Sequence, residues 1–238
     1  MSLEHSTSKY DSKFQTILHY KNFPQMIPWV GTDYDKKDHK KILFIGESHY
    51  LPKDSIIHET PDKWYSSSDS NLNVEEKRWI NTRGVMKKNE NQKYNSPSQV
   101  VIFGNIETVI QEAMEKTKYD YDESKQQFFR YCAFYNFFQR PAHIGDSLEA
   151  EPQDIKVAIE TFEKIVSILK PDFVYIVSSK VWYLPEMQKV RELKNADFSP
   201  HPSCSWWNRP CHIDKVDRNL KVTGKEKLLK FLETNKVF

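Results

Sequence analysis

Five reactive or conformationally permissive residues follow an apolar run early in the chain, in the order Gly46-Glu47-Ser48-His49-Tyr50. A serine on a tight turn can act as a nucleophile when a base lies beside it. A neighbouring glutamate and histidine can share acid and base work, and the same side chains can line a binding pocket. The run therefore predicts one of three kinds of site, and the rest of the chain must supply the partners.

Two catalytic interpretations of this run remain open. In a nucleophile elbow, Gly-x-Ser-x-Gly, small residues flank a serine on a strained turn, and here Tyr50 occupies the place of the second glycine. Ser48, an aspartate and His201 do occur in the chain order of a catalytic triad. The run is also similar to the Gly-Glu-x-His motif of the erythromycin-esterase-like families, which implies that Glu47 and His49 act together in acid–base or metal chemistry. The sequence therefore leaves a hydrolase or esterase as an alternative.

Two further polar segments follow apolar or aromatic runs. Asn136 lies in "AFYNFFQRP", after a run of aromatic residues. The segment "SPHPSCSWWNR" near the C-terminus contains residues 201–203, His-Pro-Ser, and then the adjacent Trp206 and Trp207. An amide both donates and accepts hydrogen bonds, and an imidazole can stabilise a developing anion. These segments predict a polar binding site if the fold brings them together.

Apolar strands that alternate with helices must position these segments. Apolar and aromatic runs predict strands over residues 40–46, 128–141 and 173–178, and a short fourth strand from residue 196. The spacing of apolar residues predicts helices over 13–20, 74–80, 96–116, 151–170, 179–193 and 225–235. Residues 52–97 are mostly polar, which predicts a long loop or insertion there.

This order of elements predicts one three-layer α/β/α domain over residues 1–238. Its central sheet is expected to be mostly parallel and four-stranded, with a polar insertion at about 52–97. In such sheets the ligand crevice lies outside the carboxyl ends of the strands. Glu47, Asn136 and His201 each follow a predicted strand, so we expect them to face one crevice.

The three motifs, in this order, resemble the pocket motifs of the uracil-DNA glycosylase superfamily. The first motif of that family follows the first central strand as Gly-Gln-Asp-Pro-Tyr or Gly-Glu-Ala-Pro-Gly; Gly46 and Tyr50 match the former, and Gly46 and Glu47 match the latter. Its middle strand ends in an asparagine, as at Asn136, and its last motif is His-Pro-Ser, as at residues 201–203. The matching segments cover about a quarter of the chain. The resemblance implies a uracil-DNA glycosylase-like fold.

The same resemblance implies a DNA repair function in base excision. The enzyme would hydrolyse the N-glycosidic bond of a flipped uracil or another damaged base in DNA, and a catalytically inactive member would only bind that base. Asn136 would read the base edge, Tyr50 would wall off the place of the thymine methyl group, and Phe103 or Tyr135 would stack on the base. The implied base-binding residues are Gly46, His49, Tyr50, Asn136, Phe103 and Tyr135.

Catalytic and DNA-contacting roles follow from the resemblance as well. His201 would stabilise the negative charge that develops on the departing base, and Glu47 or Ser48 would orient the attacking water. The two adjacent tryptophans would form a wedge in the minor groove, with an arginine on a phosphate. The implied DNA contacts are Ser203, Ser205, Trp206, Trp207 and Arg209.

Two departures from the family pattern bear on catalysis and cofactors. Ser48 stands where one branch has its water-activating aspartate, and a serine hydroxyl is no general base at neutral pH without a partner. His49 replaces the proline of the first motif. The branch with Gly-Glu-Ala-Pro-Gly carries four iron–sulfur cysteines, whereas this chain has three cysteines and no Cys-x-x-Cys pair. We therefore expect neither a cofactor nor a metal.

Composition sets the remaining expectations. Of the 238 residues, 38% are hydrophobic and 29% charged, and the formal net charge of +2 permits an anionic partner without requiring one. No apolar run approaches the ~20 residues of a membrane span, and the N-terminus lacks the apolar stretch of a secretory signal. We expect a cytoplasmic monomer with reduced thiols that binds double-stranded DNA and no membrane.

Overall fold

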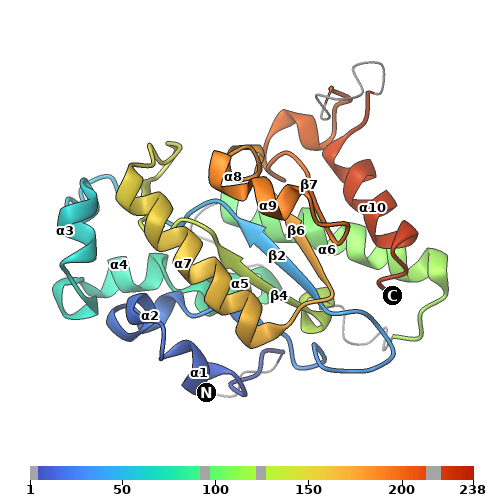
Figure 1. The fold of residues 1–238 in the computed structure, drawn as a ribbon, viewed down its shortest axis with the longest axis horizontal. Helices are drawn as coiled ribbons and strands as arrows, with labels where there is room; N and C mark the ends of the chain where they lie inside the picture. Colours follow the sequence, from blue (N-terminus) through green and yellow to red (C-terminus); the bar gives the residue numbers. More distant parts are fainter. Residues whose placement is uncertain (1–4, 92–96, 122–126, 213–220) are drawn as a thin grey trace.

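The computed structural model describes residues 5–91, 97–121, 127–212 and 221–238 around a central five-stranded sheet, in the order β1-β4-β2-β6-β7 (Figure 1). The strands are β1 (Trp29–Val30), β2 (Ile42–Gly46), β4 (Cys132–Asn136), β6 (Phe173–Ile176) and β7 (Ala196–Phe198). β1 runs antiparallel to β4, and all other neighbouring strands are parallel. The mostly parallel α/β architecture that the sequence predicts is confirmed.

Helices and 3₁₀ turns occupy most connections between the strands. The longer helices are α5 (Thr82–Asn91), α6 (Pro97–Thr117), α7 (Pro152–Leu169) and α10 (Gly224–Thr234). The shorter elements are α1 (Asp11–Phe14), α2 (Leu18–Asn22), η1 (Pro24–Met26), α3 (Pro61–Tyr65), η2 (Asp69–Asn71), α4 (Val74–Trp79), η3 (Phe128–Tyr131), α8 (Ser179–Trp182), η4 (Pro185–Met187), α9 (Gln188–Arg191) and η5 (Ser205–Trp207). None of the described helices is long and apolar enough to cross a membrane.

Side chains of the central strands alternate between two hydrophobic cores, one on each face of the sheet. In β2, Leu43 and Ile45 belong to the first core, whereas Ile42 and Phe44 belong to the second. The first core also contains residues of α7, and the second contains residues of α6 and α10, so helices cover both faces (Figure 1). Burial on both faces explains why β2 is a continuous apolar run.

The described sheet has five strands, so the expectation of four is wrong. The additional strand, β1, is only two residues long, and such a short segment carries no alternation that a sequence pattern can reveal. A second, two-stranded parallel sheet joins β3 (Tyr50–Leu51) to β5 (Ala142–His143). This small sheet matters for the site, because it holds the chain directly after Gly46-Glu47-Ser48-His49.

Two of the predicted helices are divided in the structure. Over residues 179–193, Leu184 is extended and η4 begins at Pro185, so α8 and α9 are separate helices rather than one. A residue before proline is disfavoured in the helical region, which accounts for the break. Over residues 13–20 the chain forms parts of α1 and α2, separated by an extended Ile17.

The polar segment that begins at residue 52 contains three helices, α3, α4 and α5, rather than a long loop. Trp64 of α3 is fully buried, stacks on Phe23 with ring centroids 4.2 Å apart, and donates from Nε1 to the Gln139 carbonyl at 2.9 Å. A few such aromatic anchors fix a segment whose overall composition is polar. The last of these helices, α5, contributes Thr82 and Val85 to the site described next.

Candidate functional site

Glycine at the end of β2 lets a neighbouring amide lie against the backbone. The parallel register pairs Gly46 with Asn136 at the ends of β2 and β4. A Cβ atom on Gly46 would lie 2.2 Å from Asn136 Oδ1 and 2.9 Å from Phe134 Cζ. Position 46 therefore has no room for a side chain, and the Asn136 amide occupies the space that a side chain would fill.

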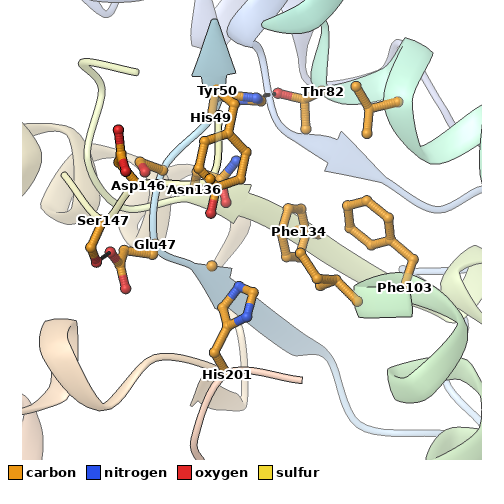
Figure 2. Close-up of a pocket in the computed structure, with 15 residues that line it drawn as sticks. Glu47, His49, Tyr50, Thr82, Phe103, Phe134, Asn136, Asp146, Ser147 and His201 are labelled. Atoms are coloured by element: carbon orange, nitrogen blue, oxygen red, sulfur yellow. Dashed lines mark hydrogen bonds between the residues drawn. The ribbon is translucent and has the colours of Figure 1, made fainter. Parts of the chain in front are cut away.

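A cavity of about 240 Å³ opens at these strand ends (Figure 2). It is lined by Gly46, Glu47, Ser48, His49, Tyr50, Thr82, Val85, Ile102, Phe103, Phe134, Asn136, Gly145, Asp146, Ser147 and His201. Glu47, Asn136 and His201, which the sequence predicts to face one crevice, all line it. Because sites for drug-sized ligands measure about 300–1,000 Å³, this pocket suits a smaller group.

The side-chain amide of Asn136 is available to bond a ligand. Its backbone carbonyl accepts a hydrogen bond from Gln139 Nε2 at 2.7 Å, whereas its side-chain amide bonds to no described residue. Figure 2 shows Asn136 among the side chains that line the pocket. An amide in this state offers one acceptor and one donor side by side to a ligand.

His201 presents a hydrogen-bond donor to the pocket. Its Nδ1 lies 2.7 Å from Ser203 Oγ and accepts a hydrogen bond from the Ser203 backbone N–H at 3.4 Å. A backbone N–H can only donate, so the proton of the neutral ring lies on Nε2. Burial lowers the pKa of His201 below its usual value, against an opposing effect of Glu47, which favours the neutral ring.

The carboxylate of Glu47 is held from both sides. Ser147 Oγ donates to Oε1 and Ser178 Oγ donates to Oε2, each at 2.9 Å, and Lys180 Nζ lies 4.0 Å from Oε1. Ser178 is itself buried and accepts from the Val181 N–H at the start of α8. The carboxylate is therefore a fixed negative charge that ties the segment around Ser147 to the sheet.

Aromatic residues form one wall of the pocket. Phe103 of α6 and Phe134 of β4 both line it and contact each other edge to face, with ring centroids 5.0 Å apart. Tyr135 does not take part, since it is buried in the core on the opposite face of the sheet. The expectation of Tyr135 as a stacking residue is corrected: side chains alternate along a strand, so Phe134 shares the face of Asn136.

The two hydrolase interpretations find no support in the geometry. His49 Nε2 lies 3.1 Å from Thr82 Oγ1, and this hydroxyl donates to the Met26 carbonyl. Burial lowers the pKa of His49 to about 4. The Ser48 hydroxyl lines the pocket without a hydrogen bond to His49, His201 or any other described residue. Glu47 is likewise bonded to two serines rather than to His49.

The loop after His201 separates the two tryptophans that the sequence places together. Trp206 is 51% exposed, whereas Trp207 is 1% exposed and lies in the second core. A Cβ atom on Gly224 would meet Trp207 Cε3 at 2.9 Å, so this indole fits closely on the start of α10. The paired wedge is therefore corrected to a single indole. Three other predicted DNA contacts, Ser203, Ser205 and Arg209, are exposed.

Connections supply several pocket residues that the motifs did not indicate. α5 contributes Thr82 and Val85, and the segment after β5 contributes Gly145, Asp146 and Ser147. Only Phe134 had a usable signal, namely its alternation with Asn136. The others reach the pocket through the way that distant helices and loops pack together, which no local pattern determines.

A second, larger hollow adjoins the pocket. This cleft measures about 660 Å³ and shares Asp146 and Ser147 with the pocket. Its other lining residues are His58, Glu59, Arg140, Pro141, Ala142, His143, Leu148, Glu149, Glu151 and Lys180. Arg140 is buried there and bonds to both Asp154 carboxylate oxygens, at 2.9 and 2.6 Å. The residues that the structure describes form no cluster able to hold a metal ion.

No family model matches the chain, and no curated protein is similar enough in sequence to count as a match.

Proposed function

We propose that this protein is a uracil-DNA glycosylase-like enzyme that binds a flipped uracil or other damaged base and hydrolyses its N-glycosidic bond. The proposal depends on one observation: Glu47, Asn136 and His201, from three separate strand ends, line a single small cavity. A flipped nucleotide needs a tight pocket with edge-reading and stacking groups. The resemblance of the three motifs and the mostly parallel sheet support the same fold family.

Base recognition falls to the unoccupied amide of Asn136. For uracil, Oδ1 accepts from N3–H and Nδ2 donates to O4, a pairing that cytosine cannot reciprocate. Phe103 and Phe134 provide the aromatic wall against which a base stacks. Tyr50 lines the same pocket as Asn136, where it would exclude a methyl group.

Leaving-group stabilisation falls to His201. As the bond between the sugar and the base breaks, the electron pair moves onto the base. A neutral imidazole with its proton on Nε2 donates a hydrogen bond to that developing anion without needing a charge of its own. A preorganised donor of this kind contributes about 10²–10³ in rate.

DNA is the proposed partner, and the exposed loop after His201 is the proposed contact. Ser203, Ser205, Trp206 and Arg209 are exposed there, next to the pocket residue His201. An exposed indole can insert between base steps, and an arginine can bind a phosphate. These residues directly follow the pocket residue His201 in the chain, which supports a duplex contact beside the pocket.

The test uses a labelled duplex with a single uracil, and parallel duplexes with hypoxanthine or xanthine in that place. Base release is scored as strand breaks at the abasic site after alkali. Wild-type protein is expected to release at least one of these bases, and His201→Ala to reduce release by about 100- to 1,000-fold. His212→Ala, an exposed histidine outside the pocket lining, is the matched control and should stay within about twofold of wild type. Absence of release from every duplex would refute the enzymatic proposal.

A binding protein without catalysis is the second candidate, favoured by Ser48 in place of the family's aspartate. It predicts salt-dependent affinity for duplex DNA with no base release. Trp206→Ala should then weaken DNA binding, whereas Leu18→Ala, another exposed apolar residue, should leave it unchanged. Equal affinity of wild type and Trp206→Ala would remove the exposed indole from the contact.

A further inference from the structure

Hydrolysis in this pocket requires a group that accepts a proton from water. Ser48 stands at the place of the family's aspartate, and its hydroxyl has no described hydrogen-bond partner to activate it. Glu47 is the nearest carboxylate in sequence, but each of its oxygens already accepts a hydrogen bond, from Ser147 and from Ser178. Ser48 therefore lacks an activating partner, and the Glu47 carboxylate is fixed in place by two serines, with only its remaining lone pairs open to water.

A second carboxylate lines the pocket from a different element. Asp146 follows β5 and is exposed, and its side chain forms no hydrogen bond or ion pair with a described residue. The turn that presents it is defined: Gly145 has φ of +87°, in the left-handed region, and the Asp146 N–H donates to the His143 carbonyl at 3.1 Å. Ser147 then ties this turn to Glu47 at 2.9 Å.

The position of Asp146 matches the place where water must react. When a flipped base fills the cavity, its sugar stays attached to the DNA strand, so C1′ remains at the mouth. Asp146 lines both the pocket and the adjoining cleft of about 660 Å³, which puts it at the rim between them. Glu47, with a side chain only 18% exposed, lies deeper. The cleft gives water access to the rim carboxylate.

We propose that Asp146 is the catalytic base of this site, an inference that rests on the proposed glycosylase function. Water forms a bond to C1′ as the bond from C1′ to the base nitrogen breaks, and the electron pair of that bond leaves with the base. One proton of the water passes to the Asp146 carboxylate, and the other stays on the new hydroxyl group. His201 and Asn136 stabilise the departing anion, and Glu47 is the positioning residue that holds the Asp146 turn through Ser147.

The experiment measures single-turnover release of uracil, or of the base that wild type releases fastest, from a labelled duplex. Asp146→Asn keeps the shape and removes the charge, and it is expected to slow release by at least about 100-fold, the lower range for a general base. Affinity for a duplex with a stable tetrahydrofuran abasic site should stay within about twofold of wild type. Asp146→Glu should restore part of the rate. Glu149→Gln is the matched control, because Glu149 is exposed on the same segment and lines the cleft but not the pocket.

The outcomes separate this inference from the function on which it rests. If wild type releases a base and Asp146→Asn does so at the same rate, the role of Asp146 is refuted and the glycosylase proposal survives. If Glu149→Gln loses as much activity as Asp146→Asn, the effect belongs to the charge of the segment and the inference also fails. If wild type releases no base from any duplex, the proposed function fails and this inference fails with it.

Discussion

The pocket and the cleft share a wall but differ in how their polar groups are used. In the larger cleft, Arg140 bonds to Asp154 and to the carbonyls of His58 and Glu149, and Lys180 bonds to the Leu148 carbonyl. These groups serve the fold. In the smaller pocket, the side-chain amide of Asn136 and the Nε2 of His201 bond to no described residue. The pocket therefore offers unused amide and imidazole groups to a ligand, whereas the unpartnered ring nitrogens of His58, which lines the cleft, are buried.

Removal of the charged group that supports the cleft should have the largest effect. Arg140→Ala is expected to lower the free energy of unfolding by about 3–5 kcal/mol, because the carboxylate of Asp154, which has a fully buried side chain, loses its partner. Urea denaturation measures the loss. The exposed pair of Lys63 and Glu59 is the control, since Lys63→Ala should cost only a small fraction of that loss. Similar losses in both variants would show that the buried pair is no special support.

Acid should destabilise the fold through histidines in both hollows. The unfolded chain protonates His49 with a pKa near 6.5, whereas burial lowers the folded pKa to about 4. Between these values the unfolded chain binds more protons, so stability falls as the pH drops from about 6.5 to 4, by up to about 3 kcal/mol for this group. His58 contributes in the same direction, with its pKa lowered to about 4. Urea denaturation at several pH values should give a shallower pH slope for His49→Gln than for wild type. Equal slopes would contradict the burial of His49.

A methyl group at position 46, in the lining of the pocket, should sharply reduce base release without changing the cleft. In Gly46→Ala the new Cβ would push Asn136 Oδ1 from its place, and a shift of about 1 Å at a reacting group costs on the order of 100-fold in rate. Base release from the uracil duplex measures this effect. Gly104→Ala is the matched control, because a Cβ there meets nothing within 4 Å. Full activity of Gly46→Ala would refute the close approach of the amide.

The smallest effect should come from the two buried histidines, with opposite signs. Neither ring nitrogen of His58 has a described partner, although both are buried, so His58→Leu should raise the free energy of unfolding by about 1 kcal/mol. His49 bonds to Thr82, so His49→Leu should lower it. Thermal unfolding of both variants measures the difference. A loss of stability in His58→Leu would show that its nitrogens are satisfied after all.

The strand ends are the part of the site that the sequence predicts. A continuous apolar run such as Ile42–Gly46 indicates a strand buried on both faces, and the carboxyl ends of parallel strands meet at one edge of a sheet. The sequence therefore predicts that Glu47, Asn136 and His201 share one edge. Side chains alternate between the two faces of a strand, so this rule also selects Phe134, rather than Tyr135, as the residue on the face of Asn136.

Sequence patterns do not predict the residues that line the pocket between the strand ends. Ser147 donates a hydrogen bond to Glu47 across a separation of 100 residues in the sequence. Thr82 belongs to a segment whose polar composition predicts a loop. β1 is too short to show a period, and the two tryptophans look equivalent until α10 covers one of them. Each of these features depends on contacts between distant segments, which local propensity does not specify.

The buried half of the tryptophan pair has a consequence for its exposed neighbour. Trp207 packs closely against Gly224 and anchors η5, so the backbone that carries Trp206 is already ordered before a ligand binds. The entropy cost of ordering this loop is therefore met during folding and not on binding. If duplex DNA is the partner, as we propose, it would meet an exposed indole on a backbone that is already held in place.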